Sequence, residues 1–422
     1  MYTDTLEDIG FMTSQELIDL EGKYGAHNYK PLPVVISSAS GVDMYDVEGK
    51  HYFDFLSAYS AVNQGHCHPR LVKAIQDQAN VLTLTSRAFY NDKLGPTEQY
   101  MAELFGYDKV LMMNSGAEAV ETAVKLARRW GYDVKQIPVN KAIIVVAVNN
   151  FHGRTTGILS FSTDKFTRDR FGPTMPGFFM VPFDDTEALD EALKMPEVCG
   201  FLVEPMQGEA GVIVPQDGYL AKVREICTRH NVLFMTDEIQ TGLARTGKML
   251  AQDYDGVKGD ILILGKALSG GMLPISAVLA NDEIMLTIKP GEHGSTFGGN
   301  PLAAAVALEA LKILVDENLA ENAFRLGQIF RAKLETLIGT GIVTTVRGKG
   351  LLNAIKVYDN HNEHAGLELC KVMMKNGVLA KQTHRNIIRF APPLVITESQ
   401  LNEATDIIIN SIREYEAHIA DN

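Results

Sequence analysis

The chain has 422 residues, of which 46% are hydrophobic and 22% are charged, and its formal net charge is −13. This balance is typical of a globular protein with a large core, and the length allows two domains. The negative charge excludes an electrostatic basis for binding nucleic acid, and no apolar run approaches the ~20 residues needed to cross a bilayer.

Two features bear on the cellular compartment. The first ten residues, MYTDTLEDIG, are acidic, which is not typical of a signal peptide or of a basic transit peptide. The cysteines lie far apart without a CxxC pair, which favours free thiols in a reducing compartment. They are Cys67, Cys199, Cys227 and Cys370. We therefore expect a cytoplasmic protein, with the mitochondrial matrix as the alternative if a leader has been removed.

In chain order, residues 1–60 predict a helix, a proline-containing loop and a hairpin. From about residue 108, short apolar strands alternate with helices. The predicted strands are 109–113, 143–148, 178–181, 200–203, 232–236, 261–264 and 275–279, and the helices among them include 117–130, 187–194 and 217–230. Nearly unbroken apolar strands between helices indicate a parallel sheet covered on both faces.

The C-terminal part changes pattern. It predicts helices at 301–316, 318–338, 364–376 and 398–416, with strands at 342–356 and 387–390. We expect residues 1–60 to pack with a small α+β domain formed by 306–422, and residues 61–305 to form a large ligand-binding α/β domain.

Lys266 and Asp237 each follow one of the predicted strands. Ligands of a parallel sheet bind at the carboxyl ends of its strands. A partly desolvated lysine has a lowered pKa and becomes a nucleophile suited to Schiff-base formation. A carboxylate opposite it needs a cation, and the protonated pyridine nitrogen of pyridoxal phosphate (PLP) is one. Alone, these residues are better explained as a surface lysine and as a helix cap or metal ligand; together they favour a PLP site.

Further strand ends supply the rest of such a site. The segment 115–117 (Ser-Gly-Ala) opens a helix, where backbone N–H groups bind phosphate, although an ordinary helix cap has the same sequence. Phe151 can stack on a flat heterocycle and Arg154 can bind a carboxylate, although a core phenylalanine beside a surface arginine is the simpler interpretation. Glu209 lies in a glycine-rich loop after another strand.

Competing motifs are weaker. The segment 242–249 (GLARTGKM) nearly matches a P-loop, but Met249 stands where a hydroxyl must hold Mg²⁺. The run 66–68 (His-Cys-His) has no second ligand cluster and predicts a turn before a helix at 70–80 rather than a metal site. No GxGxxG follows a strand, so a nicotinamide dehydrogenase is weakly supported.

The sequence resembles the class III (ω-amino) aminotransferases, which are PLP enzymes of fold type I. The matching stretches are NSGAEA (114–119), NFHGRT (150–155), VEPMQGEAGV (203–212), TDEIQTGLARTGK (236–248), LGKALSGG (264–271), HGSTFGGNP (293–301) and VRGKGLL (346–352). More particular segments are YGAHNYKPLP (24–33), FLSAYSAVNQGHCHP (55–69), LTSRAFYN (84–91) and IIRFAPPL (387–394).

The resemblance implies a mostly parallel sheet flanked by helices, with PLP in the large domain. It implies that Lys266 holds the cofactor covalently and moves a proton, and that Asp237 pairs with the pyridine nitrogen. The other implied cofactor residues are Ser115, Gly116, Ala117, Phe151, His152 and Gln240, with Ser295 and Thr296 supplied by the second subunit of a homodimer.

The implied reaction transfers the δ-amino group of L-ornithine to 2-oxoglutarate, which belongs to proline and arginine metabolism. Tyr29 would bind the α-amino group of ornithine and Arg154 its α-carboxylate, while Tyr59 lines the pocket. Arg389 would bind the α-carboxylate of 2-oxoglutarate, and Glu209 would mask it until then. The alternatives are N-acetylornithine, 4-aminobutyrate or another ω-amine as donor, or a binding protein that does not use PLP.

Overall fold

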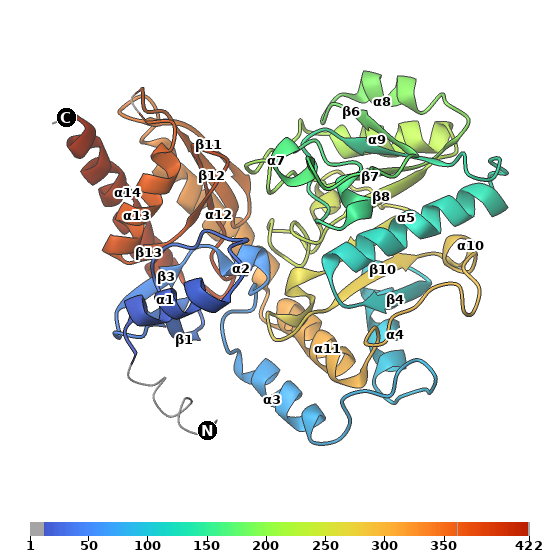
Figure 1. The fold of residues 1–422 in the computed structure, drawn as a ribbon, viewed down its shortest axis with the longest axis horizontal. Helices are drawn as coiled ribbons and strands as arrows, with labels where there is room; N and C mark the ends of the chain where they lie inside the picture. The colour runs from blue at the N-terminus through green and yellow to red at the C-terminus, as the bar shows by residue number, and fades with distance from the viewer. Residues whose placement is uncertain (1–11, 361, 421–422) are drawn as a thin grey trace.

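The structure is a computed structural model that describes residues 12–360 and 362–420 (Figure 1). The acidic N-terminal decapeptide therefore lies outside the described residues. A larger body, on the right in Figure 1, contains the central sheet, and a smaller body on the left combines elements from both ends of the chain. Among the described helices, none is long and apolar enough to cross a membrane.

The central sheet has seven strands in the order β4-β10-β9-β8-β7-β5-β6. Their bounds are β4 Lys109–Met113, β5 Ile143–Ala147, β6 Phe178–Val181, β7 Val198–Val203, β8 Leu233–Asp237, β9 Ile261–Leu264 and β10 Ser276–Ala280. Every pairing is parallel except those of β10, which runs antiparallel to β4 and β9. The prediction of a mostly parallel α/β sheet is confirmed, with one reversed strand.

Alternate residues of the strands face opposite sides of the sheet and pack against different helices. Ile144 on β5 belongs to one buried cluster with Ala123 and Ala127 of α5 (Gly116–Asp133). Its neighbour Val145 belongs to another cluster with Val223 of α9 (Tyr219–Arg229). The small residues on α5 allow this helix to approach the sheet closely. Other helices of this body are α3 Pro69–Ala79, α4 Leu94–Phe105, α8 Thr186–Ala192, α9 Tyr219–Arg229 and α11 Pro301–Asp316.

The smaller body contains two four-stranded sheets, in the orders β1-β2-β3-β13 and β11-β12-β15-β14. Strand β13 (Val378–Leu379) pairs in parallel with β3 (His51–Asp54), which joins the two ends of the chain. Phe55, Phe330 and Phe390 pack on one another between these sheets and α12. Further bounds are α1 Ser14–Tyr24, β1 Ile36–Ser40, β2 Asp43–Asp46, α12 Leu319–Glu335, β11 Val343–Lys349, β12 Leu352–Val357, α13 Ala365–Asn376, β14 Lys381–Thr383, β15 Ile387–Phe390 and α14 Glu398–Ala420.

Several elements differ from the sequence-based expectation. The strands expected at 342–356 are the hairpin of β11 and β12, which turns at Gly350 with a φ of 54°. Helix α4 was not predicted. The domain boundaries at 60/61 and 305/306 stay predictions, and the second falls inside α11, which packs against α3 and α4. Short helices are α2 Ser57–Ser60, α6 Thr156–Leu159, α7 Lys165–Arg168, α10 Asp282–Met285, η2 Ala251–Tyr254 and η3 Lys266–Ser269.

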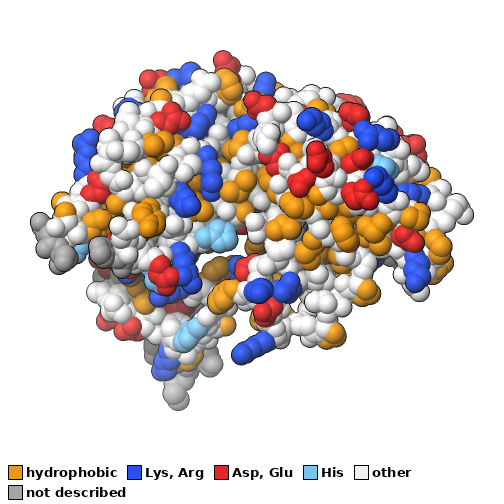
Figure 2. All heavy atoms as spheres, turned by 90° about the horizontal axis from the view of Figure 1, so that it is seen from above, with side chains coloured by type: hydrophobic (Ala, Val, Ile, Leu, Met, Phe, Trp, Pro, Cys, Tyr) orange, Lys and Arg blue, Asp and Glu red, His pale blue; other side chains and the backbone are white. Residues whose placement is uncertain are grey.

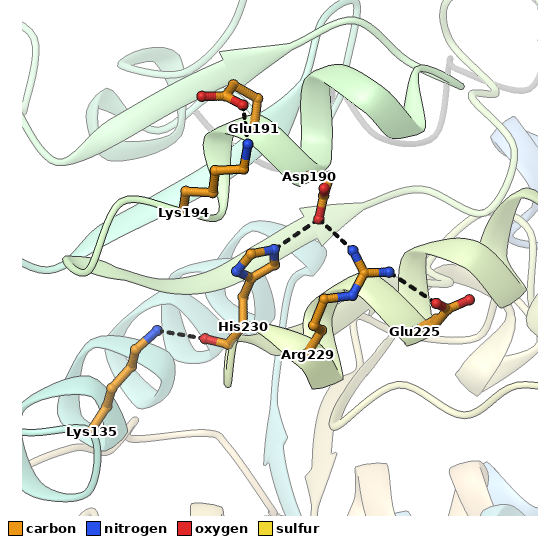
Figure 3. Close-up of polar contacts among 7 residues, drawn as sticks. All are labelled: Lys135, Asp190, Glu191, Lys194, Glu225, Arg229 and His230. Carbon is orange, nitrogen blue, oxygen red and sulfur yellow. Dashed lines mark hydrogen bonds and ion pairs between the residues drawn. The ribbon is translucent and has the colours of Figure 1, made fainter.

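A polar network lies at the amino-terminal ends of the parallel strands (Figure 3). The Nζ atom of Lys135 donates hydrogen bonds to the carbonyl oxygens of Val198 and His230, at 2.7 and 3.2 Å. The Asp190 carboxylate pairs with the ring of His230 at 2.8 Å and with Arg229 at 3.0 Å. Because Val198 begins β7, these contacts lie at the end of the sheet opposite the carboxyl ends of the strands, and we assign them a structural role.

Candidate active site

A cavity of about 160 Å³ lies at the carboxyl ends of the parallel strands. The residues that line it come from the ends of five strands and include many that the sequence predicted. The predicted residues that line it are Gly116, Ala117, Phe151, His152, Glu209, Asp237, Gln240 and Lys266.

Lys266 follows β9 after one residue, Gly265, and begins a tight turn. Its φ is 45°, a left-handed conformation that L-residues rarely adopt. No hydrogen bond or ion pair among the described residues involves its amino group. Burial lowers the pKa of Lys266, and this effect outweighs the opposing influence of Glu209 and Asp237. The amine therefore loses its proton more readily than an exposed lysine.

Asp237 ends β8, the strand next to β9 in the sheet. Its Oδ2 lies 2.6 Å from Nδ1 of His152, and both side chains are buried. Its Oδ1 accepts a hydrogen bond from the backbone N–H of Ile239 at 3.0 Å. Burial alone would lower the pKa of His152, but the contact with Asp237 outweighs it and raises the pKa. The contact with Asp237 therefore favours the protonated imidazole of His152.

A second acid, Glu204, lines the same cavity and was missed in the sequence. Its Oε2 accepts a hydrogen bond from the backbone N–H of Phe151 at 3.0 Å, which fixes the start of the segment that carries Phe151. Burial raises the pKa of Glu204 to about 7. The signal was present, because this acid follows the apolar strand β7 directly, and Asp237 and Lys266 likewise lie at the carboxyl ends of β8 and β9.

Glu209 and Arg389 form an ion pair at the rim of the cavity. Nη1 of Arg389, on β15, lies 2.5 Å from Oε1 of Glu209, and the arginine side chain is only 2% exposed. Gln240 donates a second hydrogen bond to the same oxygen at 3.0 Å. Burial opposes ionisation of Glu209, but Arg389 and Lys266 outweigh it and lower its pKa to about 2. The Glu209 carboxylate is thus charged, and its ion pair keeps the guanidinium of Arg389 from binding another anion.

Tyr59 reaches the site from a strained turn. Residues 57–60 all have positive φ, between 47° and 71°, although none is glycine. Left-handed backbone costs about 1–2 kcal/mol for each such residue, so surrounding contacts must hold the turn. Asp54 does so by accepting hydrogen bonds from the backbone N–H groups of Leu56 and Ser57, both at 2.8 Å. The Tyr59 ring then lies 5.3 Å from the guanidinium carbon of Arg389.

The other predicted site residues lie outside the cavity lining. Ser115 caps α5 in a capping box with Glu118, and Ser295 accepts a hydrogen bond from Asn114 of the same chain at 2.8 Å. Thr296, Tyr29 and Arg154 are exposed. Burial raises the pKa of Tyr59 and the carboxylate of Glu209 raises it further, whereas the guanidinium groups of Arg389 and Arg154 lower it, so Arg154 lies near enough to act on Tyr59. Their roles stay predictions.

The segment that resembles a P-loop forms a buried turn. Arg245 within it is fully buried and donates hydrogen bonds to Asn63 Oδ1 and to the carbonyl oxygens of Leu351 and Pro392. Arg245 therefore joins the large body to two segments of the small body, at Leu351 and at Pro392, a role that the sequence did not reveal. In the His-Cys-His run at 66–68, His66 pairs with Asp54 and His68 pairs with Glu317. Each imidazole thus has a carboxylate partner within the chain.

The cavity fits PLP in its donor set. It contains the carboxylate of Asp237 and three polar atoms that have no hydrogen-bond partner among the described residues, which are Nζ of Lys266, Nε2 of His152 and Oε1 of Gln240. An amine is the group that condenses with the PLP aldehyde, and a carboxylate is the group that keeps its ring nitrogen protonated.

Comparisons with known proteins agree with this fit. The family described as aminotransferase class-III matches residues 24–412. The chain is 60% identical over 392 residues to a mitochondrial ornithine aminotransferase of Drosophila melanogaster, covering 93% of this chain and 90% of that protein. It is 58% identical over 403 residues to the mitochondrial ornithine aminotransferase of Rattus norvegicus, covering 96% and 91%.

Solved structures share the fold. An ornithine aminotransferase from Toxoplasma gondii superposes with a TM-score of 0.95 at 48% identity, covering 98% of each chain. An acetylornithine aminotransferase from Elizabethkingia anophelis superposes with a TM-score of 0.88 at 55% identity, covering 96% of this chain and all of that one. Another T. gondii structure is described with PLP at partial occupancy in the active site.

Proposed function

This chain belongs to the class-III aminotransferases, PLP-dependent transaminases of fold type I, and from that membership we propose that its amino donor is L-ornithine, which reacts through its δ-amino group. The acceptor is 2-oxoglutarate. The products are glutamate and glutamate 5-semialdehyde, which cyclises to pyrroline-5-carboxylate, an intermediate of proline and arginine metabolism.

When bound, PLP supplies the electron sink and carries the amino group between the two substrates. Lys266 would hold it, Asp237 would keep its ring nitrogen protonated, and Phe151 would stack on the ring. Ser115, Gly116 and Ala117 would bind its phosphate at the start of α5, where backbone N–H groups and the helix dipole favour an anion. His152 would support Asp237, and Gln240 would reach the ring oxygen.

Lys266 also serves as the proton carrier in this proposal. Its lowered pKa favours the unprotonated amine, which would accept a proton from the substrate carbon that bears the amino group and pass it on in a 1,3-proton shift. The absence of a competing ion pair in the described part of the chain leaves the amine free to move between these positions.

The observation that carries the proposed specificity is the ion pair between Glu209 and Arg389, with its 2.5 Å contact. A free arginine there would bind the α-carboxylate of any amino acid and bring the α-amine to the reacting position. Because Glu209 occupies the guanidinium, ornithine would instead place its α-carboxylate on Arg154 and its α-amino group at Tyr29. The distant δ-amine then reaches the cofactor.

The acceptor requires the pair to open. 2-Oxoglutarate has two carboxylates, which would bind to Arg389 and Arg154. The dicarboxylate replaces the negative charge that Glu209 supplies to Arg389, so the buried guanidinium is never left without an anion. Glu209 thus acts as a switch that lets one pocket accept two substrates of different shape.

We also propose a homodimer in which Ser295 and Thr296 of one subunit complete the phosphate site of the other. Support comes from large apolar side chains left exposed on a single chain, among them Phe89 (70%), Tyr90 (95%) and Phe297 (56%). Figure 2 shows hydrophobic side chains gathered over one half of the face it draws.

For the compartment we propose the cytoplasm, with the mitochondrial matrix as the alternative suggested by relatives named mitochondrial.

A donor panel assayed against 2-oxoglutarate tests this function. Ornithine, N-acetylornithine, 4-aminobutyrate and L-lysine are each supplied to the holoenzyme, and glutamate and pyrroline-5-carboxylate are measured. We expect the highest kcat/KM with ornithine. A higher value with N-acetylornithine would overturn the proposed donor and favour the activity for which the E. anophelis relative is named.

The Tyr29→Phe variant separates these donors further. It removes the hydroxyl proposed to bind the α-amino group, so the KM for ornithine should rise while the KM for 2-oxoglutarate stays unchanged. An unchanged KM for ornithine would contradict the assignment of Tyr29.

A further inference from the structure

Residues 207–213, which carry Glu209, form a small hairpin. Gln207 and Ile213 pair through both backbone hydrogen bonds, at 3.1 and 2.9 Å. The hairpin leaves the large body after β7, and Glu209 lies at its tip beside the turn closed by the hydrogen bond from Gly211 N–H to the Gly208 carbonyl.

The hairpin is attached mainly to the small-domain sheet. Met206 and Val212 are buried in one apolar cluster with Leu352, Ala354 and Ala391 of the small domain. On the other side, the large body contributes the hydrogen bond from Gln207 Nε2 to the Val148 carbonyl, at 2.8 Å, and the one from Gln240 to Glu209.

Two small-domain side chains also bind the hairpin backbone. Thr383, on β14, donates its hydroxyl to the backbone carbonyl of Glu209 at 2.5 Å. Arg347, on β11, donates Nε–H to the backbone carbonyl of Gly211 at 2.8 Å. The approach is close: a Cβ atom at Gly211, whose φ is 107°, would lie 2.7 Å from Ile387 and 3.0 Å from Arg347.

The same strand pair positions Arg389. Thr383 pairs with Ile387 across β14 and β15, and Arg389 lies two residues after Ile387. The side chains of Thr383 and Arg389 therefore point to the same face of the sheet. The backbone of Glu209 and the guanidinium that its side chain pairs with are thus both held by β14 and β15.

We propose that Thr383 and Arg347 are positioning residues for substrate selection, because they fix the backbone of Glu209 relative to Arg389. This rests on the function proposed above. With the backbone fixed, only the carboxylate swings when 2-oxoglutarate arrives, and it returns to Arg389 when the acceptor leaves. Without these anchors the carboxylate masks Arg389 less well, and α-amino donors gain access to the guanidinium.

The test compares the two half-reactions in holoenzyme variants. Absorbance of the bound cofactor follows its reaction with ornithine, an ω-donor, and separately with L-glutamate, an α-donor. For Thr383→Val, we expect the ratio of kcat/KM for ornithine to kcat/KM for glutamate to fall about fivefold, the factor that corresponds to one ordinary hydrogen bond. Arg347→Met should change the ratio in the same direction.

Two further variants separate positioning from general damage. Thr383→Ser keeps the hydroxyl and should restore the ratio. Thr344→Val removes a comparable hydrogen bond, from Thr344 Oγ1 to the Lys356 carbonyl at 3.1 Å in the same sheet, and should leave the ratio unchanged. The melting temperature of each holoenzyme is measured in parallel, and if Thr383→Val does not fold, Arg347→Met carries the test.

An unchanged ratio in folded Thr383→Val and Arg347→Met would overturn the proposal, as would an equal change in Thr344→Val. Failure of the donor assignment is distinguishable, because then the wild-type holoenzyme itself would not react with ornithine. In that case the ratio is measured with the ω-donor that the donor panel identifies, and the same outcomes decide.

Discussion

The imidazole Nδ1 of His152 lies 2.6 Å from Oδ2 of Asp237, and neither side chain is more than 4% exposed. His152 follows β5 and Asp237 ends β8, so two strand ends bring the pair together. A buried carboxylate is stable only when hydrogen bonds and positive charge compensate its desolvation. The histidine and the Ile239 N–H supply part of that compensation and fix the direction in which the aspartate faces the cavity.

Asp237→Asn should reduce kcat by about 10³-fold, because an amide cannot keep the ring nitrogen of PLP protonated. His152→Phe should have a smaller effect, since it removes the hydrogen bond but leaves the charge. Steady-state kinetics with saturating PLP, together with the PLP dissociation constant, check both variants. An Asp237→Asn enzyme with kcat near that of the wild type would contradict the assignment.

Glu209→Gln should shift donor preference. The amide removes the charge that masks Arg389, so the half-reaction with L-glutamate should accelerate by about tenfold or more relative to that with ornithine. The fall in the ornithine-to-glutamate ratio should exceed that of Thr383→Val, because the carboxylate itself is lost. A ratio equal to that of the wild type would show that Glu209 does not mask Arg389.

Glu204 predicts a pH dependence of stability. Burial raises its pKa from 4.5 to about 7, so the folded state retains a proton that the unfolded state has lost between these pH values. Stability from this group is therefore complete below pH 4.5 and is lost as the pH rises through about 7. The amide of Glu204→Gln can still accept the Phe151 hydrogen bond but does not titrate. The difference in the free energy of unfolding between Glu204→Gln and the wild type should therefore be more favourable to the variant at pH 8 than at pH 5, by on the order of 2 kcal/mol.

Unfolding of wild type and Glu204→Gln is compared at both pH values, for example in urea. If the difference between the two proteins is the same at pH 5 and pH 8, Glu204 does not titrate in this range.

Arg245→Met should lower stability by about 2–4 kcal/mol, because it leaves buried carbonyl oxygens of Leu351 and Pro392 without donors. Arg325→Met is the matched control. Arg325 is 51% exposed in its ion pair with Glu398, so its loss should cost about 0–1 kcal/mol. Thermal unfolding of the two holoenzymes checks the contrast, and equal shifts would contradict a special role for Arg245.

Many residues that line the cavity could be predicted from the sequence because they lie at the carboxyl ends of apolar strands. Apolar strands 178–181, 261–264 and 387–390 have the same bounds in the structure, since buried strands bounded by polar residues leave a clear local pattern. Parallel strands bring their carboxyl ends to one edge, so Lys266, Asp237 and Phe151 could be placed together without knowing the strand order.

Other features had no local signal. The reversed direction of β10 depends on how the chain crosses the sheet, and the pairing of β13 with β3 joins residues more than 300 positions apart. Arg245 looks like a surface residue in sequence, because the carbonyl groups that satisfy it come from distant segments. The contact of Thr383 with Glu209 likewise depends on tertiary packing across 174 positions.

The central claim is that the amino group leaves the δ-carbon of ornithine. The direct test supplies the holoenzyme with L-ornithine carrying ¹⁵N only at the δ-nitrogen, together with 2-oxoglutarate, and analyses the products by mass spectrometry. We expect ¹⁵N in glutamate and unlabelled pyrroline-5-carboxylate. Unlabelled glutamate, with ¹⁵N retained in the ornithine-derived product, would contradict it.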